Sequence, residues 1–295
     1  MTRRLRRGRP GSQGVERIAR RELDKALKDL TGDWPPEDEV VHRARKRLKN
    51  ARSALRLARA TLGDDLYQRE NQALRDVARP LSEVRDATVM VQSLEGLELN
   101  GAGDVERLRE QLRANQRRVR RKVLADRRAA APLVIALRES RRRVDRARPV
   151  RHGWAAIGPG LRRTYRAGRR GFAAAQKSPT ADRLHEWRKQ TKYWWNILRI
   201  LEPIAPRALK KLADQAHRLS DHLGEDHDLV VLRRRSTEPR TALMPSTRAA
   251  VLERIDRRRE ALQKSAMALG AIVYQHRPRN VERRLHRRWR AWRSA

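Results

Sequence analysis

Residues 42–49 read HRARKRLK, and residues 185–192 read HEWRKQTK. The two stretches share the pattern His-x-x-Arg-Lys-x-x-Lys and begin 143 residues apart. An eight-residue pattern that recurs in one chain indicates an internal duplication.

A second pair of stretches supports this duplication. Residues 81–86 (LSEVRD) and 223–228 (LGEDHD) carry Leu, Glu and Asp at matching positions and begin 142 residues apart. Two patterns that recur at nearly the same separation predict two equivalent halves. We expect these halves to span roughly residues 15–150 and 151–295, with four helices in each.

The apolar residues around both stretches are spaced for α-helices. They recur three and four residues apart, which is the spacing of one buried helix face. The first row is Val41, Ala44, Leu48, Ala51, Leu55, Ala58 and Leu62, and the second is Leu184, Trp187, Thr191, Trp194, Leu198 and Leu201. Strand patterns are lacking, so we predict an all-α fold of about eight helices.

Glycine and proline indicate where these helices end. Pro80 and Pro132 lie inside helical stretches, and we expect each to kink or split its helix. Residues 1–14 contain many arginines and are expected to form a flexible basic arm. We expect breaks near residues 32–36, 63–65, 96–104, 149–160, 178–179, 203–206 and 236–246.

The charge of the chain points to a polyanionic partner. Its 72 Lys and Arg against 35 Asp and Glu give a net charge of +37. Solubility needs a net charge of only about 2–8 in a small domain, and a larger excess destabilises a compact fold. Nucleic acid, an anionic membrane surface and polyphosphate are the candidate partners.

The same composition limits where and how the protein acts. No apolar run reaches the roughly 18 residues of a membrane span. The chain has no cysteine, which removes disulfides and thiolate metal sites. We therefore expect a cytoplasmic protein without a membrane span.

Cations form a second row beside each apolar row. On a helical wheel, these rows border the core-facing side and point into the groove between helices. Like charges about 5–6 Å apart are destabilising unless an anion lies among them. A linear chain of phosphates supplies such charges, so we expect binding that strengthens as the pH falls from about 8 to 6 and the histidines gain protons. The rows are His42, Arg45, Lys49, Arg52 and Arg56, and His185, Arg188, Lys192 and Arg199.

The two repeated patterns resemble those of the CHAD domain family, the conserved histidine α-helical domain. The resemblance covers residues 15–295 and implies one domain of two pseudo-symmetric antiparallel four-helix bundles around a basic central groove. It also implies binding of inorganic polyphosphate and, in bacteria, association with polyphosphate granules. The strand pattern of the triphosphate tunnel domain, which often accompanies this family, is not found, so we expect a stand-alone domain.

Carried over by position, the resemblance implies a set of polyphosphate contacts. Trp195 stands where an Arg is common in the family, which thins the second cationic row. The implied contacts are His42, Arg45, Lys46, Lys49, Arg52, Arg85, His185, Arg188, Lys189, Lys192 and His227.

Other functions stay open from the sequence. The main alternative is a nonspecific RNA- or DNA-binding protein, in which nucleic acid competes as the polyanion. An enzyme acting on polyphosphate would need carboxylates to hold a metal, and the repeated pattern contains almost none. We therefore expect no catalytic residue, no metal site and no cofactor. Trp289 and Trp292, among C-terminal arginines, either clamp the tail on the bundle or bind an anionic surface.

Overall fold

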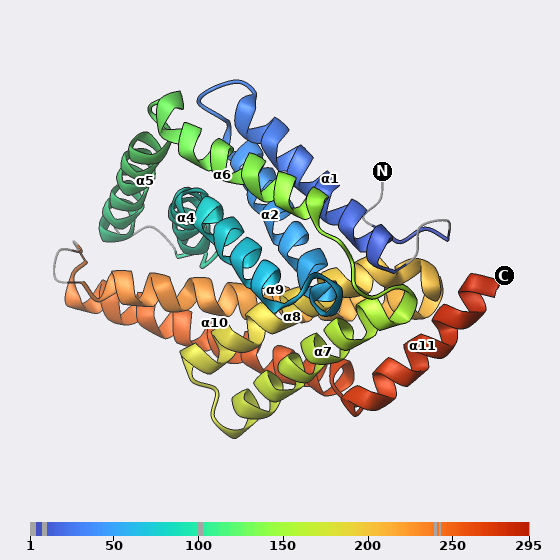
Figure 1. The fold of residues 1–295 in the computed structure, drawn as a ribbon. Coiled ribbons are helices and arrows are strands. Elements are labelled where there is room, and N and C mark those ends of the chain that lie inside the picture. Colours follow the sequence, from blue (N-terminus) through green and yellow to red (C-terminus); the bar gives the residue numbers. More distant parts are fainter. Residues whose placement is uncertain (1–3, 8–10, 100–102, 239–240, 242, 295) are drawn as a thin grey trace.

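The computed structural model describes residues 4–7, 11–99, 103–238, 241 and 243–294. Every secondary-structure element in these ranges is a helix, which confirms the all-α prediction. Figure 1 shows the long helices packed against one another in two groups. The elements are α1 (Ser12–Thr31), α2 (Asp38–Leu57), α3 (Arg59–Leu62), α4 (Asp64–Glu95), α5 (Gly103–Leu124), α6 (Arg127–Arg146), α7 (Gly153–Lys177), α8 (Ala181–Leu201), the 3₁₀ turn η1 (Glu202–Ile204), α9 (Pro206–Ser236), α10 (Pro245–Val273) and α11 (Pro278–Ser294).

The helices contact one another in the same order in both parts of the chain. In the first part α1 packs on α2 and α6, α2 packs on α4, and α4 packs on α5. In the second part α7 packs on α8 and α11, α8 packs on α9, and α9 packs on α10. Each part therefore holds five long helices, not four, within the described ranges. The two-fold symmetry between the parts stays a prediction.

The predicted breaks identify most helix ends but miss two of them. The chain also breaks between α5 and α6 and between α10 and α11, which raises the number of helices. Pro80 lies inside the continuous helix α4, and Pro132 lies inside the continuous helix α6, so neither proline splits its helix.

The break expected over 149–160 ends earlier, because α7 already begins at Gly153. The glycines and the proline of this stretch resemble a loop, but Gly160 serves close packing. A Cβ on Gly160 would lie 2.2 Å from the carbonyl oxygen of Leu57. The missing side chain therefore lets α7 approach the end of α2.

The predicted apolar rows form the core. Leu48 and Leu55 of α2 are at most 1% exposed, and Trp187 and Trp194 of α8 are fully buried. Tyr165 of α7 packs edge-on against Trp194, with 5.0 Å between the ring centroids. With their apolar sides buried in this way, α2 and α8 present their cationic rows to the space between them.

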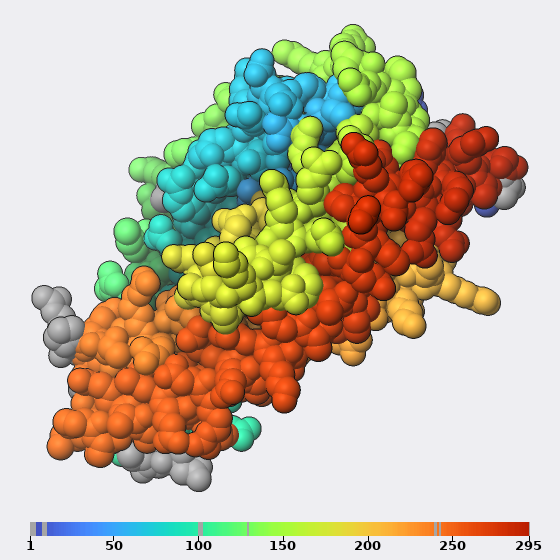
Figure 2. All heavy atoms as spheres, turned by 90° about the horizontal axis from the view of Figure 1, so that it is seen from below, coloured from blue at the N-terminus to red at the C-terminus, as the bar shows by residue number. Residues whose placement is uncertain are grey.

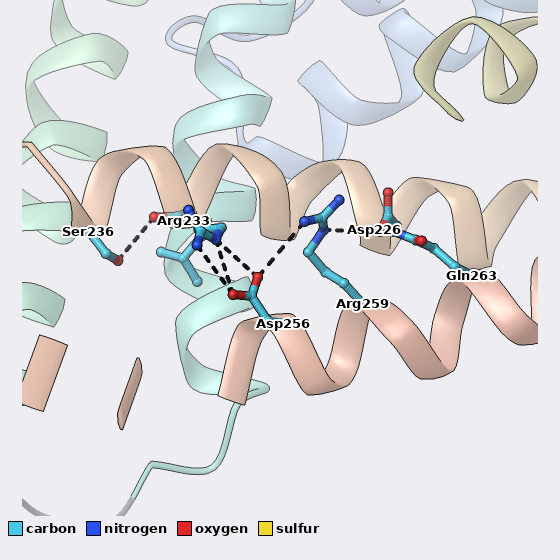
Figure 3. Close-up of polar contacts among 7 residues, drawn as sticks. Asp226, Arg233, Ser236, Asp256, Arg259 and Gln263 are labelled. Atoms are coloured by element: carbon cyan, nitrogen blue, oxygen red, sulfur yellow. Dashed lines mark hydrogen bonds and ion pairs between the residues drawn. The ribbon is translucent and has the colours of Figure 1, made fainter. Parts of the chain in front are cut away.

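Polar contacts fix α9 against α10 (Figure 3). The buried carboxylate of Asp226 accepts hydrogen bonds from Arg259 at 3.1 Å and from Gln263 at 2.8 Å. Further along, Arg233 pairs with Asp256 at 3.0 Å. These contacts orient α9 so that Asp228, two residues after Asp226, faces away from α10.

The start of the chain differs from the expected flexible arm. Leu5 is 3% exposed, and its N–H donates a 3.0 Å hydrogen bond to the carbonyl of Ile200. Helix α1 begins at Ser12, inside the expected arm. Burial of an apolar residue thus holds this segment on the bundle, while residues 1–3 and 8–10 of the arm lie outside the described residues. None of the described helices is both long and apolar enough to cross a bilayer.

Candidate polyanion groove

Helices α2 and α8 lie against each other and place both cationic rows on one surface. Arg52 of α2 donates a 2.8 Å hydrogen bond to the hydroxyl of Tyr193 on α8. Arg52 also donates to Asn71 on α4 at 3.0 Å. The two histidine patterns, distant in sequence, therefore meet at one site.

One cavity at this site has a wholly cationic and neutral lining, and we call it the acid-free cavity. Its volume is about 350 Å³. Four elements contribute only if α9 is counted, whereas α2, α4 and α8 supply all of the described lining residues, and none of these is acidic. They are Lys49, Arg52, Arg56, Asn71, Arg75, His185, Arg188, Lys189, Gln190, Lys192, Tyr193 and Asn196.

A neighbouring cavity of about 330 Å³ has a mixed lining, and we call it the mixed cavity. Asp86, Asp221 and Asp228 line it together with cations from α2, α4 and α8. Arg188 and Lys192 line both cavities and also a third, of about 390 Å³, between α4 and α9. The three cavities therefore adjoin, and together they form what we call the groove.

Eleven of the thirteen residues predicted as polyphosphate contacts line the acid-free or the mixed cavity. These eleven are His42, Arg45, Lys46, Lys49, Arg52, Arg56, Arg85, His185, Arg188, Lys189 and Lys192.

The other two predicted residues have different partners. Arg199 pairs at 3.0 Å with Glu202, a buried carboxylate that also pairs with Arg4. The charge of Arg199 is therefore used within the fold. His227 contacts the groove residue His185, with 3.2 Å between their Nδ1 atoms, but it does not line the cavities described above.

Lys49 lies where cations of both helices converge. Burial lowers its pKa from 10.5 to about 7, and the nearby charges of Arg45, Arg188 and Lys192 lower it further. Burial is also the main cause that lowers the pKa of Arg52. Holding these side chains charged without an anion is costly, so the groove favours a negatively charged occupant.

The histidines of the groove are held mainly in their neutral forms. Burial, followed by the charge of Arg85, lowers the pKa of His42. Burial, followed by Arg188, lowers the pKa of His185. The pKa of His227 falls to about 4 through burial and its proximity to His185. The direction agrees with the sequence-based expectation, although burial outweighs the neighbouring cations.

The carboxylates of the mixed cavity lie beside its cations. Arg45 donates to Ser82 at 3.2 Å and lies 3.6 Å from Asp86. Burial raises the pKa of Asp228 to about 6, against the lowering effect of Arg188. Asp86 and Asp228 occupy matching positions of the two 81–86 and 223–228 stretches, yet they were not predicted as site residues.

Several lining residues were missed because they come from packing against α4. Asn71, Arg75, Ser82 and Asp86 are spaced 4, 7 and 4 residues apart, which places them on one face of that helix. The repeated Asp86 marks this face in the sequence, and extending it backwards by helical spacing would have found Arg75. Tyr193 and Asn196 carry no such signal.

Comparison with known proteins agrees with the repeated patterns. The family model described as the CHAD domain matches residues 17–237, from α1 to just beyond the end of α9. The match is shorter than the expected 15–295 and leaves α10 and α11 outside. No curated protein matches the chain. Because the matched residues make up most of the sequence and contain both histidine patterns, the chain belongs to the CHAD domain family.

Proposed function

We propose that this protein binds inorganic polyphosphate in the groove and does so without catalysing a reaction. The observation that carries the proposal is the acid-free cavity, where Lys49, Arg52 and Arg56 of α2 face Arg188 and Lys192 of α8. A linear phosphate chain carries one negative charge per unit and is thin enough to follow such a cavity. Each cation that replaces a condensed counterion on the chain adds to the affinity.

The aromatic rings of the groove favour a phosphate chain over nucleic acid bases. The guanidinium of Arg56 lies 4.0 Å from the centroid of the Tyr193 ring. The ammonium of Lys192 lies 4.5 Å from the centroid of the Trp195 ring. Single-stranded nucleic acid binds by stacking its bases on free aromatic faces, whereas here cations cover a face of each ring.

The carboxylates of the groove support binding over catalysis. Asp86 lies beside Arg45, and Asp221 contacts His217 at 2.6 Å and Lys192 at 3.9 Å. These contacts orient the groove cations. Incubating the protein with Mg²⁺ and polyphosphate should release no phosphate above the background without protein, and steady release would refute the non-enzymatic part of the proposal.

A competition experiment tests the choice of ligand. Labelled long-chain polyphosphate is bound to the protein at fixed salt and displaced by unlabelled polyphosphate or by single-stranded RNA, compared at equal phosphate concentration. We expect polyphosphate to compete at concentrations at least about tenfold lower than RNA. Equal or better competition by RNA would contradict the proposal.

The proposal extends to location in the cell. A protein that binds long polyphosphate should concentrate on polyphosphate granules where these form. A fluorescent fusion should co-localise with granules and become diffuse when polyphosphate synthesis is removed. Unchanged foci after that removal would contradict this part of the proposal.

A further inference from the structure

The C-terminal helix α11 is held firmly on the bundle by its inner face. Val281, Leu285 and Trp289 of this face are buried. Trp154 at the start of α7 stacks on His286 with 5.1 Å between the ring centroids, and it also contacts Trp289. The apolar side of α11 is therefore already packed, which answers the question about the C-terminal tryptophans in favour of a clamp.

The outer face of α11 carries a row of exposed arginines. Arg279, Arg283, Arg287 and Arg290 are spaced 4, 4 and 3 residues apart, so they follow one side of the helix. We call these four residues the α11 arginine row. At a rise of 1.5 Å per residue, the row is about 16 Å long. Figure 2 shows α11, in dark red, on the molecular surface with no other element over it.

The α11 arginine row has no ion pair with any residue that the structure describes. Exposed arginines elsewhere do pair: Arg257 pairs with Glu253, and Arg233 pairs with Asp256. The one acidic residue of α11, Glu282, is held by Arg162 of α7 at 3.3 Å. The four charges of the row are therefore left for a partner outside the chain.

The shape of this surface differs from that of the groove. The groove consists of cavities that admit a thin, flexible chain, whereas α11 presents its charges on a protruding helix. A nucleic acid duplex is too wide for the cavities but can lie along such a helix. Duplex DNA carries one negative charge per about 1.7 Å of its axis, so a 16 Å row faces about nine charges.

We propose that the α11 arginine row is a docking surface for the phosphate backbone of double-stranded nucleic acid, separate from the groove. Phosphate contacts by arginine position a duplex without reading its bases, so this binding is independent of sequence. The surface lies outside residues 17–237, which match the family model. The protein thereby has two polyanion sites of different shape.

Duplex binding by the full-length protein tests this proposal. Fluorescence anisotropy with labelled DNA of about 20 base pairs compares the wild type with the combined variant Arg279→Gln, Arg283→Gln, Arg287→Gln and Arg290→Gln. We expect a loss of at least about 30-fold in affinity, and a decrease of about 3–4 in the slope of log affinity against log salt. Replacing the same four residues with Lys should keep most of the binding, because the contacts are to phosphate charge.

A matched control separates a specific surface from the general charge of the protein. The run Arg117, Arg118, Arg121 and Lys122 on α5 is exposed, and changing it to Gln also removes four charges. This control variant should lose less than about threefold. An equal loss in both variants, or no loss in the α11 variant, would overturn the proposal.

Two further measurements complete the test. Vesicles containing phosphatidylglycerol should bind the protein no better after removal of salt competition than duplex DNA does at equal negative charge, and a clear preference for the vesicles would overturn the assignment to nucleic acid. Polyphosphate binding by the α11 variant should stay within a few-fold of the wild type. The two sites thus have separate readouts, and failure of one proposal is distinguishable from failure of the other.

Discussion

The side-chain amide of Asn196 on α8 donates a 3.1 Å hydrogen bond to the hydroxyl of Ser53 on α2. These residues are 143 positions apart, which is also the separation of the two histidine patterns. Both are buried, and the Ser53 hydroxyl donates in turn to the carbonyl of Lys49 at 2.7 Å. Equivalent positions of the two helices thus meet at the floor of the groove and fix the register of its cationic rows.

The first prediction concerns this contact. Ser53→Ala removes the acceptor of a buried hydrogen bond, and we expect it to lower the free energy of unfolding by about 1–2 kcal/mol. Polyphosphate affinity should fall with it, because the two rows lose their fixed register. Denaturant unfolding and a binding titration measure both effects. Ser294→Ala, at an exposed position near the C-terminus, should change neither, and equal effects of the two substitutions would argue against the role of Ser53.

The fold and most of the groove follow from local patterns in the sequence. Helical spacing identified α2 and α8 and buried the predicted residues, such as Leu48 and Trp194. The cationic rows then follow from their phase relative to the core, which is why Lys49 and Arg188 were found.

Tertiary packing decides what the sequence could not. Arg56 and Arg199 lie 143 residues apart at matching positions, but only Arg56 lines the acid-free cavity. The difference arises because the chain turns after α8 and buries Glu202 within reach of Arg199. The contribution of Arg75 likewise depends on how α4 packs beside α2, which no periodicity within α2 reveals.

The second prediction follows from that difference. Arg56→Gln should weaken polyphosphate binding by about 3–10-fold and leave stability nearly unchanged, because its charge faces the cavity. Arg199→Gln should do the reverse: it leaves buried Glu202 with Arg4 as its remaining ion-pair partner among the described residues. We expect it to lower the free energy of unfolding by about 1–2 kcal/mol. Thermal unfolding and binding titrations of both variants check this, and a large binding defect in Arg199→Gln would contradict it.

The third prediction compares cations at the two ends of the groove. Arg75 lines the acid-free cavity, whereas Arg258 lines the third cavity and pairs with Glu225 at 2.7 Å. Arg75→Gln should reduce polyphosphate affinity by about 3–10-fold, and Arg258→Gln by less than about twofold, because Glu225 already offsets that charge. Both variants lose one positive charge, so they serve as matched controls in one titration. The opposite order would place the ligand at the α9 end.

The fourth prediction is a pH dependence that comes from Lys49. Its pKa of about 7 in the free protein leaves it partly neutral at pH 8. Bound phosphate favours the charged form and raises this pKa, so binding takes up a proton above pH 7. Affinity should therefore fall by up to about tenfold per pH unit between pH 7.5 and 9 from this group alone. Asp228, with a pKa near 6, and the histidines add proton uptake at lower pH.

The sign of the effect on stability is opposite and gives an independent check. In the unfolded chain Lys49 holds its proton up to about pH 10.5, while in the folded free protein it loses the proton near pH 7. The unfolded state thus binds more protons between these values, so stability without ligand rises with pH across this window. Lys49→Met should flatten both profiles, that of affinity and that of unfolding free energy. Lys46→Met removes a charge from an exposed position of the same helix and should leave both slopes in place. Unchanged slopes in Lys49→Met would show that another group titrates.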